Sequence, residues 1–181
     1  MITIRNEVPA DTGAREALLD AAMGEGRCRK TSQRLRDGRL PARGLSLIAE
    51  NEEGEIVGTV RLWNVTAGPN RPSLLLGPLA VDPRCQSRGT GSLLMRLAIA
   101  RAAELGHGSI LLVGDAPYYG RFGFSAARTQ RLRLPGPYEA HRFLALELRT
   151  NALAGAAGLV KPTGLRVPEP EPAEAGLREA A

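Results

Sequence analysis

The sequence predicts an α/β domain built on a mixed β-sheet, and three observations carry this prediction. The chain has 181 residues, 43% of them hydrophobic, which is enough for one domain with its own core and short for two. Apolar runs of strand length alternate with helical repeats along most of the chain. Residues 73–124 contain an apolar run, a glycine-rich polar turn, an amphipathic run and a second apolar run, which is the order strand, turn, helix, strand. The two strands of this unit should be parallel neighbours, because a crossover through a helix returns in the same direction.

The first part of the chain predicts a strand, a helix and a basic segment. Apolar and polar residues alternate over residues 2–8, and Asp11 or Thr12 can cap the helix that follows. Residues 27–43 carry seven basic side chains against the single acid Asp37, which indicates a short helix with a basic outer face. This face is either solvated surface or a wall that attracts an acidic acceptor. Binding of nucleic acid or of an acidic protein through it is a less favoured alternative.

Three strands should follow. Residues 45–48 and 56–65 flank a polar turn that ends in glycine, which is typical of a β-hairpin. Residues 74–81 are apolar almost throughout, as in a central strand that is covered on both faces. The pair Gly77-Pro78 is out of place there, because proline cannot donate to the sheet, so we expect a bulge or a splay. The backbone groups of Leu79, Ala80 and Val81 would then be free for a ligand.

The remainder of the chain completes the expected domain. Residues 93–105 carry an apolar stripe at helical spacing, 110–113 form a strand and 116–122 a short helical turn. Residues 132–134 and 143–148 predict two closing antiparallel strands, and 153–159 could form a terminal turn of helix. We expect a single domain over residues 1–160. Residues 161–181 are rich in Pro, Glu and Ala and should form a disordered or extended tail.

The composition indicates the cellular location of the protein and the charge of its ligand. No stretch approaches the roughly 18 apolar residues of a membrane span, and the start of the chain does not look like a signal peptide, so we expect a soluble, cytoplasmic protein that does not bind membranes. Cys28 and Cys85 fit no metal-ligand spacing, and we expect no metal. The net charge of +5 supports an anionic ligand without identifying one.

The glycine-rich turn predicts a phosphate site. Residues 84–91 place two glycines and two arginines just before a helix, where free N–H groups and the helix dipole favour negative charge. A P-loop is excluded because no Gly-Lys-Ser/Thr follows, and a dinucleotide fingerprint fits poorly because Leu94 stands at the third glycine. The stretch from Gln86 to Gly91 matches a third scheme, Gln/Arg-x-x-Gly-x-Gly/Ala, in which successive backbone N–H groups hold a pyrophosphate.

At this turn the chain resembles the GNAT superfamily of acetyl-coenzyme A dependent N-acetyltransferases. The sequence LAVDP leads into the turn, and residues 118–124, YYGRFGF, are similar to the tyrosine-containing segment that the family carries after the next strand. The resemblance covers residues 2–148. It implies the GNAT fold, in which helices flank a mostly antiparallel sheet that splays at the parallel pair on either side of the turn and helix. It also implies transfer of an acetyl group from acetyl-CoA to an amine.

The resemblance further implies roles for individual residues. Tyr119 would be the general acid that donates a proton to the leaving thiolate. Backbone groups of Leu79, Ala80 and Val81 would receive the pantetheine arm. The pyrophosphate would lie on the turn and the residues beside it, which are Arg84, Gln86, Ser87, Arg88, Gly89, Thr90, Gly91 and Ser92.

The acceptor half of the reaction stays open in the sequence. Glu50, Asp82, Asp115 and His141 are all candidates for the general base, and none stands out. The acceptor could be a small molecule or a peptide amine, with a slight preference for one that carries a carboxylate or phosphate. A GNAT-fold protein that holds acyl-CoA without turnover is the main alternative, and a homodimer is a further expectation from the family.

Overall fold

A computed structural model describes residues 1–85 and 89–168; the expected cofactor residues Gln86, Ser87 and Arg88 and the chain beyond residue 168 lie outside the described residues. The three α-helices are α1 (Thr12–Met23), α2 (Thr90–Glu104) and α3 (Ala116–Gly120). The strands are β1 (Thr3–Asn6), β2 (Ser46–Glu50), β3 (Ile56–Ala67), β4 (Pro72–Val81), β5 (Ser109–Val113), β6 (Leu132–Arg133), β7 (Phe143–Glu147) and β8 (Gly158–Pro162).

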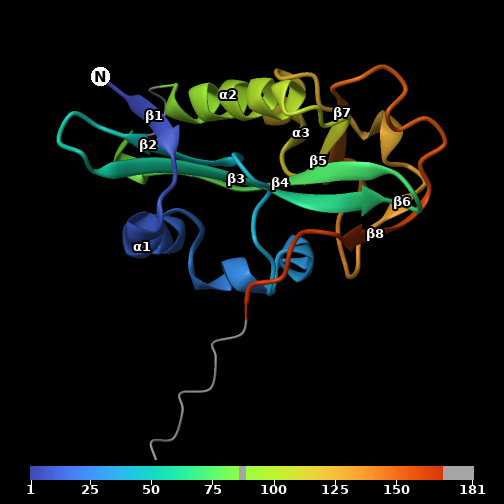
Figure 1. The fold of residues 1–181 in the computed structure, drawn as a ribbon, viewed down its shortest axis with the longest axis horizontal. Coiled ribbons are helices and arrows are strands. Elements are labelled where there is room, and N and C mark those ends of the chain that lie inside the picture. Colours follow the sequence, from blue (N-terminus) through green and yellow to red (C-terminus); the bar gives the residue numbers. More distant parts are fainter. Residues whose placement is uncertain (86–88, 169–181) are drawn as a thin grey trace, which may run out of the picture.

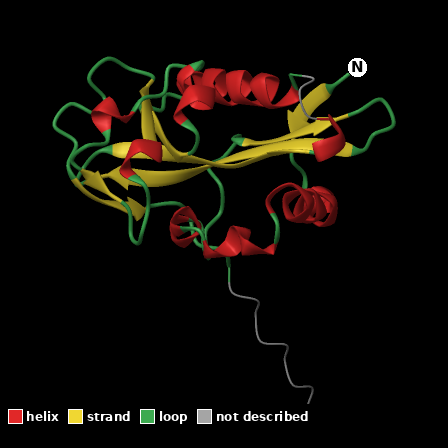
Figure 2. Cartoon of the chain, turned by 180° about the vertical axis from the view of Figure 1, so that it is seen from behind, coloured by secondary structure: helices red, strands yellow, loops and turns green. Residues whose placement is uncertain are grey.

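All eight strands belong to one sheet of order β1-β2-β3-β4-β5-β7, with β8 beside β3 and β6. Helix α2 covers one face of this sheet, and α1 and the short turns after it cover the other (Figures 1 and 2). Each face has its own apolar core. Leu94, Met95 and Ala98 of α2 belong to the first core, whereas Leu35 and Trp63 belong to the second. Leu93 and Leu105, which we expected in the apolar stripe of α2, are exposed.

The bulge expected at Gly77-Pro78 is present in β4. Leu79 pairs with Val60 of β3 and Leu76 pairs with Leu62, so β4 carries one residue more than its partner between these two pairs. The indole Nε1 of Trp63 donates a hydrogen bond of 2.6 Å to the carbonyl oxygen of Gly77. Trp63 is buried, so it both packs in the core and holds the backbone of the bulge in place.

Strands β4 and β5 form the parallel pair, and they separate shortly after they meet. Their pairing consists of Leu74 with Ile110 and Leu75 with Leu111. On its other edge β4 stays paired with β3 as far as Val81. The later half of β4 therefore turns one edge of its backbone toward the gap between the two strands, as expected, and the fold class predicted from the sequence is confirmed.

Three expectations for the rest of the fold need correction. The basic segment forms two short 3-10 helices, η2 (Glu25–Arg29) and η3 (Thr31–Leu35), because Lys30 between them is extended. Strand β7 is antiparallel to β5, but β6 lies parallel to β8 and does not pair with β7. The helical turn expected at 153–159 is instead a set of turns followed by β8.

Strand β8 also runs across the domain boundary that we expected after residue 160. The chain then stays on the domain: Leu40 donates its N–H to the carbonyl of Leu165, and Val167 donates its N–H to the carbonyl of Gly38. Val160 fills the second core, which is the physical reason why this segment docks. None of the described helices is long and apolar enough to cross a membrane.

Candidate active site

A cleft of about 800 Å³ opens where β4 and β5 separate. Its walls are the end of β4, the start of α2, the end of β5 and the helix α3. The residues that line it are Met23, Lys30, Leu79, Val81, Cys85, Gly89, Thr90, Gly91, Ser92, Val113, Gly114, Asp115, Tyr118, Tyr119, Arg121 and Arg142. The structure thus brings the predicted residues of β4, the glycine turn and Tyr119 to one cavity.

The start of α2 offers backbone donors to this cleft. Gly89 caps the helix with a left-handed backbone, φ 84°, which favours glycine. The N–H groups of the first turn have no acceptor within the helix and carry its positive dipole end. The side chain of Thr90 is buried, so Thr90 can offer only its backbone to a ligand. At Gly91 a Cβ atom would lie 3.0 Å from the hydroxyl oxygen of Tyr118, so this glycine leaves space for the tyrosine beside the helix start.

The charges around the cleft suit an anionic ligand. Lys30, Arg121 and Arg142 line it, against the single carboxylate of Asp115 among the described lining residues. That carboxylate caps α3, where its Oδ2 accepts a hydrogen bond of 3.3 Å from the N–H of Tyr118. The guanidinium of Arg121 lies 4.5 Å from the centre of the Tyr118 ring, which holds this cation at the rim.

Tyr119 is held tightly against the end of β5. A Cβ atom at Gly114 would lie only 2.1 Å from Cε2 of Tyr119, so the ring occupies the space that any side chain at residue 114 would need. The ring also packs edge-on against Tyr118 and Phe124. Burial raises the pKa of Tyr119 to about 12, with a smaller contribution from Tyr118. The hydroxyl therefore keeps its proton at neutral pH, as a proton donor must.

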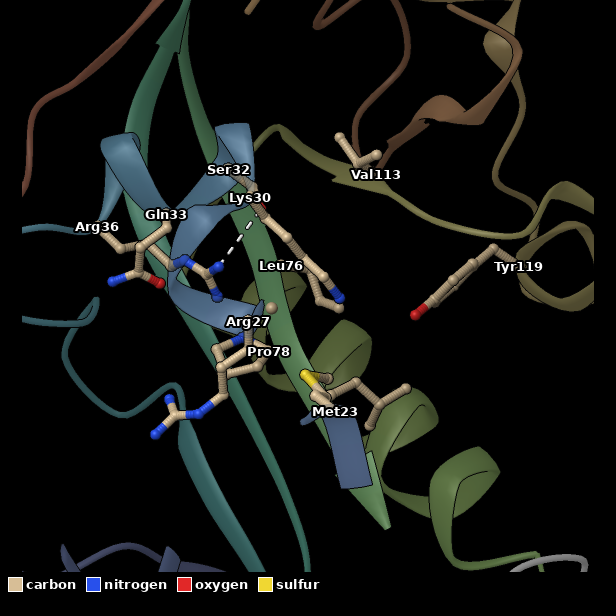
Figure 3. Close-up of a pocket in the computed structure, with 12 residues that line it drawn as sticks. Met23, Arg27, Lys30, Ser32, Gln33, Arg36, Leu76, Pro78, Val113 and Tyr119 are labelled. Carbon is tan, nitrogen blue, oxygen red and sulfur yellow. Dashed lines mark hydrogen bonds between the residues drawn. The ribbon is translucent and has the colours of Figure 1, made fainter. Parts of the chain in front are cut away.

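A second, smaller pocket of about 90 Å³ adjoins the cleft. Figure 3 shows it with the side chains of Lys30 and Tyr119 both pointing into it. The two cavities share five residues, namely Met23, Lys30, Leu79, Val113 and Tyr119. The small pocket is otherwise walled by η2, η3 and the bulge of β4, which contribute Arg27, Ser32, Gln33, Arg36, Leu76, Gly77 and Pro78. Tyr119 thus stands where a large cavity meets a small one.

Two predicted site residues do not line the cleft. The side chain of Arg84 is exposed and binds Asp82 at 2.7 Å, and both residues line a hollow on another part of the surface. Ala80 is buried and pairs with Thr59 of β3, so its backbone is part of the strand but its side chain is not at the cavity. The cleft therefore takes Leu79 and Val81 from β4, the two residues that flank Ala80.

None of the four candidate bases lies in the small pocket. Glu50 is bound by Arg5, Asp82 by Arg84, His141 lines a separate hollow, and Asp115 caps α3 in the larger cleft. No Asp, Glu or His is among the described residues that line the small pocket. In the part of the chain that the structure describes, no group of three or more His, Cys, Asp or Glu side chains could hold a metal ion.

Several side chains of the basic segment, residues 27–43, are buried or already bound to other residues. Arg27 binds Glu16 and Asp20, Arg34 donates to the carbonyl of Pro135, and Arg36 is buried. These contacts fix the segment as a wall of the small pocket. They leave little of the continuous basic face that a nucleic-acid site would need.

Several residues of the cleft and pocket were not assigned to the site from the sequence, and Lys30, Val113, Gly114 and Tyr118 are four of them. In the sequence Lys30 is one residue of a charge run, and Val113 is one residue of an apolar strand. Gly114 and Tyr118 flank the predicted residues closely, but only the packing of the tyrosine rings shows what they do.

The chain is similar to known acetyltransferases in sequence and in fold. A family model described as "Acetyltransferase (GNAT) family" matches residues 15–124, more than half of the chain. The N-acetyltransferase YhbS of Escherichia coli, described as uncharacterized, is 32% identical over 160 residues, which are 87% of this chain and 94% of YhbS.

Two solved structures have a similar fold. The GNAT family N-acetyltransferase YhbS from Escherichia coli, in complex with CoA, has a TM-score of 0.76 and 31% identity, and the match covers 90% of this chain and 89% of YhbS. A GNAT family acetyltransferase from Brucella melitensis, in complex with acetyl-CoA, has a TM-score of 0.61 and 28% identity, with 81% and 88% of the two chains covered.

Proposed function

The chain belongs to the GNAT family of acetyltransferases, and on this premise we propose that it transfers an acetyl group from acetyl-CoA to a primary amine by direct attack. The observation that carries the proposal is the pair of joined cavities with Tyr119 between them. The larger would hold the donor and the smaller the acceptor. The two relatives that were solved with CoA and with acetyl-CoA support acetyl-CoA as the donor.

We propose that the donor lies with its pyrophosphate at the start of α2. The N–H groups of Gly89, Thr90, Gly91 and Ser92 would bind it, together with Gln86, Ser87 and Arg88 of the turn. The pantetheine arm would run along the free edge of β4 and pair with backbone groups at Leu79 and Val81, as an added strand does. Arg84 could join the phosphates only if its side chain left Asp82, and we assign it no more than an auxiliary role.

The proposed reaction needs no covalent intermediate on the protein. The amine nitrogen attacks the thioester carbon, the C–N bond forms and the C–S bond breaks. The sulfur receives the proton of the Tyr119 hydroxyl, the nitrogen gives up a proton to water, and a solvent proton then restores the tyrosine. A backbone N–H near Leu79 or Val81 would stabilise the negative charge on the carbonyl oxygen.

Binding of both substrates next to each other would also accelerate the reaction. Because the cavities meet at one point, an amine in the small pocket and a thioester in the cleft are held close together, which removes much of the entropic cost of their encounter. Among the described lining residues of the small pocket no carboxylate or imidazole is present as a base. The amine would therefore lose its proton to water.

The small pocket has no carboxylate or imidazole among its described lining residues. An alternative function is therefore an acyl-CoA binding protein that does not catalyse acetyl transfer. Calorimetry with acetyl-CoA tests the donor site, and absence of binding at millimolar concentration would exclude both functions. Release of free CoA thiol in the presence of a panel of amines then separates an enzyme from a binding protein.

Tyr119→Phe tests the assigned acid directly. The variant should lower kcat by roughly 10²-fold or more, the range for loss of a positioned general acid, and leave the dissociation constant of acetyl-CoA unchanged. Tyr138→Phe is the matched control, because Tyr138 packs on Phe143 and lines neither cavity of the site. An unaltered rate in Tyr119→Phe would remove Tyr119 from the mechanism.

The cytoplasmic location and the homodimer stay predictions. Sedimentation of the purified chain would test the homodimer.

A further inference from the structure

Arg36 is a buried cation that forms no ion pair with the residues that the structure describes. Its side chain follows η3, and the residue is 8% exposed. Its Nη2 donates one long hydrogen bond of 3.3 Å to the hydroxyl of Ser32, and its Nε has no partner among residues 1–85 and 89–168. None of the ion pairs between described residues includes Arg36, although the equally buried Arg15 is paired with both Glu7 and Glu16.

The guanidinium of Arg36 lines the small pocket beside the bulge of β4. The position that a Cβ atom would take at Gly77 lies 3.8 Å from Nη1 of Arg36, an ordinary contact distance, so the guanidinium lies directly beside the backbone of the bulge. Figure 3 shows Arg36 on the η3 side of the pocket, with its hydrogen bond to Ser32, and Tyr119 on the opposite side. The pocket thus has a cation at one wall and the proposed proton donor at the other.

An unpaired guanidinium in such a place is costly. Transfer of a charge out of water is unfavourable unless a counter-charge or hydrogen bonds replace the lost solvent, and removal of one partner from a buried pair destabilises proteins strongly. A guanidinium carries five N–H donors, and Arg36 uses one of them on another residue of the described chain. Burial also lowers the pKa of Arg36 to about 10, although the group stays charged at neutral pH.

The charge balance of the pocket points to a ligand with one negative charge. Arg27 also lines it, but Glu16 and Asp20 already neutralise that side chain. Lys30 lies at the junction with the cleft and is exposed to solvent. The buried positive charge that is left for a ligand is therefore that of Arg36 alone. A planar carboxylate matches the fork of a guanidinium with two parallel hydrogen bonds, and it is small enough for a pocket of about 90 Å³.

We propose that the acetyl acceptor is an amine that carries a carboxylate, and that Arg36 binds this carboxylate. The inference rests on the proposed function, because it assigns the small pocket to the acceptor. The carboxylate would lie between Arg36 and the hydroxyl of Ser32, and the amine would face Tyr119 and the thioester. Arg36 then fixes which end of the acceptor enters the pocket first, and it makes acceptors without a carboxylate poor substrates.

Matched acceptors test the proposal. Amino acids, their α-carboxamides and amines with a phosphate ester would be compared as acetyl acceptors by release of CoA thiol. We expect the free acids to be used with a kcat/KM roughly 10- to 100-fold above that of the amides, the range for one charge-assisted pair. An enzyme that does not distinguish acid from amide, or that prefers the phosphate esters, overturns the proposal.

Variants then locate the effect. Arg36→Gln should reduce kcat/KM for the acids to the level of the amides, leave the amides unchanged and keep the affinity for acetyl-CoA. Arg36→Lys should retain part of the preference, which also covers the case that the glutamine variant does not fold. Arg29→Gln removes an exposed charge of the same basic segment that lines neither cavity, and it should change nothing. Equal losses for acids and amides in Arg36→Gln would mean a structural role only.

A binding measurement separates this proposal from the proposed function. Calorimetric titration with N-acetylated amino acids and with their amides needs no turnover. Binding of the acids to the wild type, loss of that binding in Arg36→Gln and a smaller loss in Arg36→Lys would support the carboxylate site even in a protein that releases no CoA. Equal binding of acids and amides would refute the carboxylate site even in an active acetyltransferase.

Discussion

Gly114→Ala tests the placement of Tyr119 without touching its hydroxyl. A Cβ atom at residue 114 would lie 2.1 Å from Cε2, 2.7 Å from Cδ2 and 3.1 Å from Cζ of Tyr119. The backbone of Gly114 is not left-handed, so alanine brings no backbone strain there. To reach an ordinary contact distance of 3.4 Å, the ring must move by about 1.3 Å.

A displacement of this size should be costly for catalysis. A misplacement of about 1 Å can lower a rate by roughly 10²-fold, so we expect Gly114→Ala to lower kcat about as much as Tyr119→Phe does. The double variant should be no slower than either single variant, since a displaced ring without a hydroxyl has nothing further to lose. Single-turnover measurements with saturating acetyl-CoA would report this step.

The control for this experiment lies in α3. A Cβ atom at Gly120 would meet nothing within 4 Å, and the backbone there is not left-handed, so Gly120→Ala should keep full activity. A normal kcat in Gly114→Ala combined with a low kcat in Tyr119→Phe would show that the hydroxyl acts from a tolerant position. Losses that multiply in the double variant would show that the two residues act separately, and the reasoning about the ring would then be wrong.

Three further predictions concern pH and stability. Because burial raises the pKa of Tyr119 to about 12, its proton is lost only as the pH rises through that value; the rate should have no falling limb between pH 8 and 10, and such a limb that vanished in Tyr119→Phe would contradict the assignment. Burial lowers the pKa of Arg36 from its ordinary value to about 10, so its charge costs the folded state about 3 kcal/mol below pH 10; Arg36→Met should raise the free energy of unfolding in urea at pH 7, and a lower value would show that the guanidinium is well paired. Glu7, which is 7% exposed in its side chain, binds both Arg15 and Arg61, so Glu7→Gln should destabilise the fold by about 3 kcal/mol, whereas a loss below about 1 kcal/mol would show that water replaces the missing charge.

The cleft that we propose for the donor contains features that were predictable from the sequence, because they depend on the backbone. Glycine and proline limit the backbone locally, so the bulge at Gly77-Pro78 and the helix start at Gly89 were visible in the order of residues alone. The parallel pair followed from the crossover helix between its strands. These features need no knowledge of distant contacts.

The small pocket that we propose for the acceptor was not predictable, because it is made by segments that meet only in the folded chain. The short helix η3 lies beside the bulge of β4, which is about forty residues later in the chain. In the folded chain Arg36 is buried there, and its charge lines the small pocket. In the sequence Arg36 was one of seven basic residues in a run, and nothing local distinguished it from Arg29. The same limit applies to β8, whose few apolar residues gave no sign that they would dock on β3.

The cationic small pocket also bears on how the acceptor loses its proton. An ammonium group that faces Tyr119 in this pocket is repelled by the charges of Arg36 and Lys30, which lowers the pKa of the bound amine and favours its neutral, nucleophilic form. A carboxylate on the same molecule would neutralise Arg36 and hold the amine in place. The charge of Lys30 would still be present, so the pKa of the amine would stay lowered in part. The pocket could thus select the reactive form of the acceptor by its charge, and a dedicated base, for which the described lining residues offer no candidate, would be unnecessary.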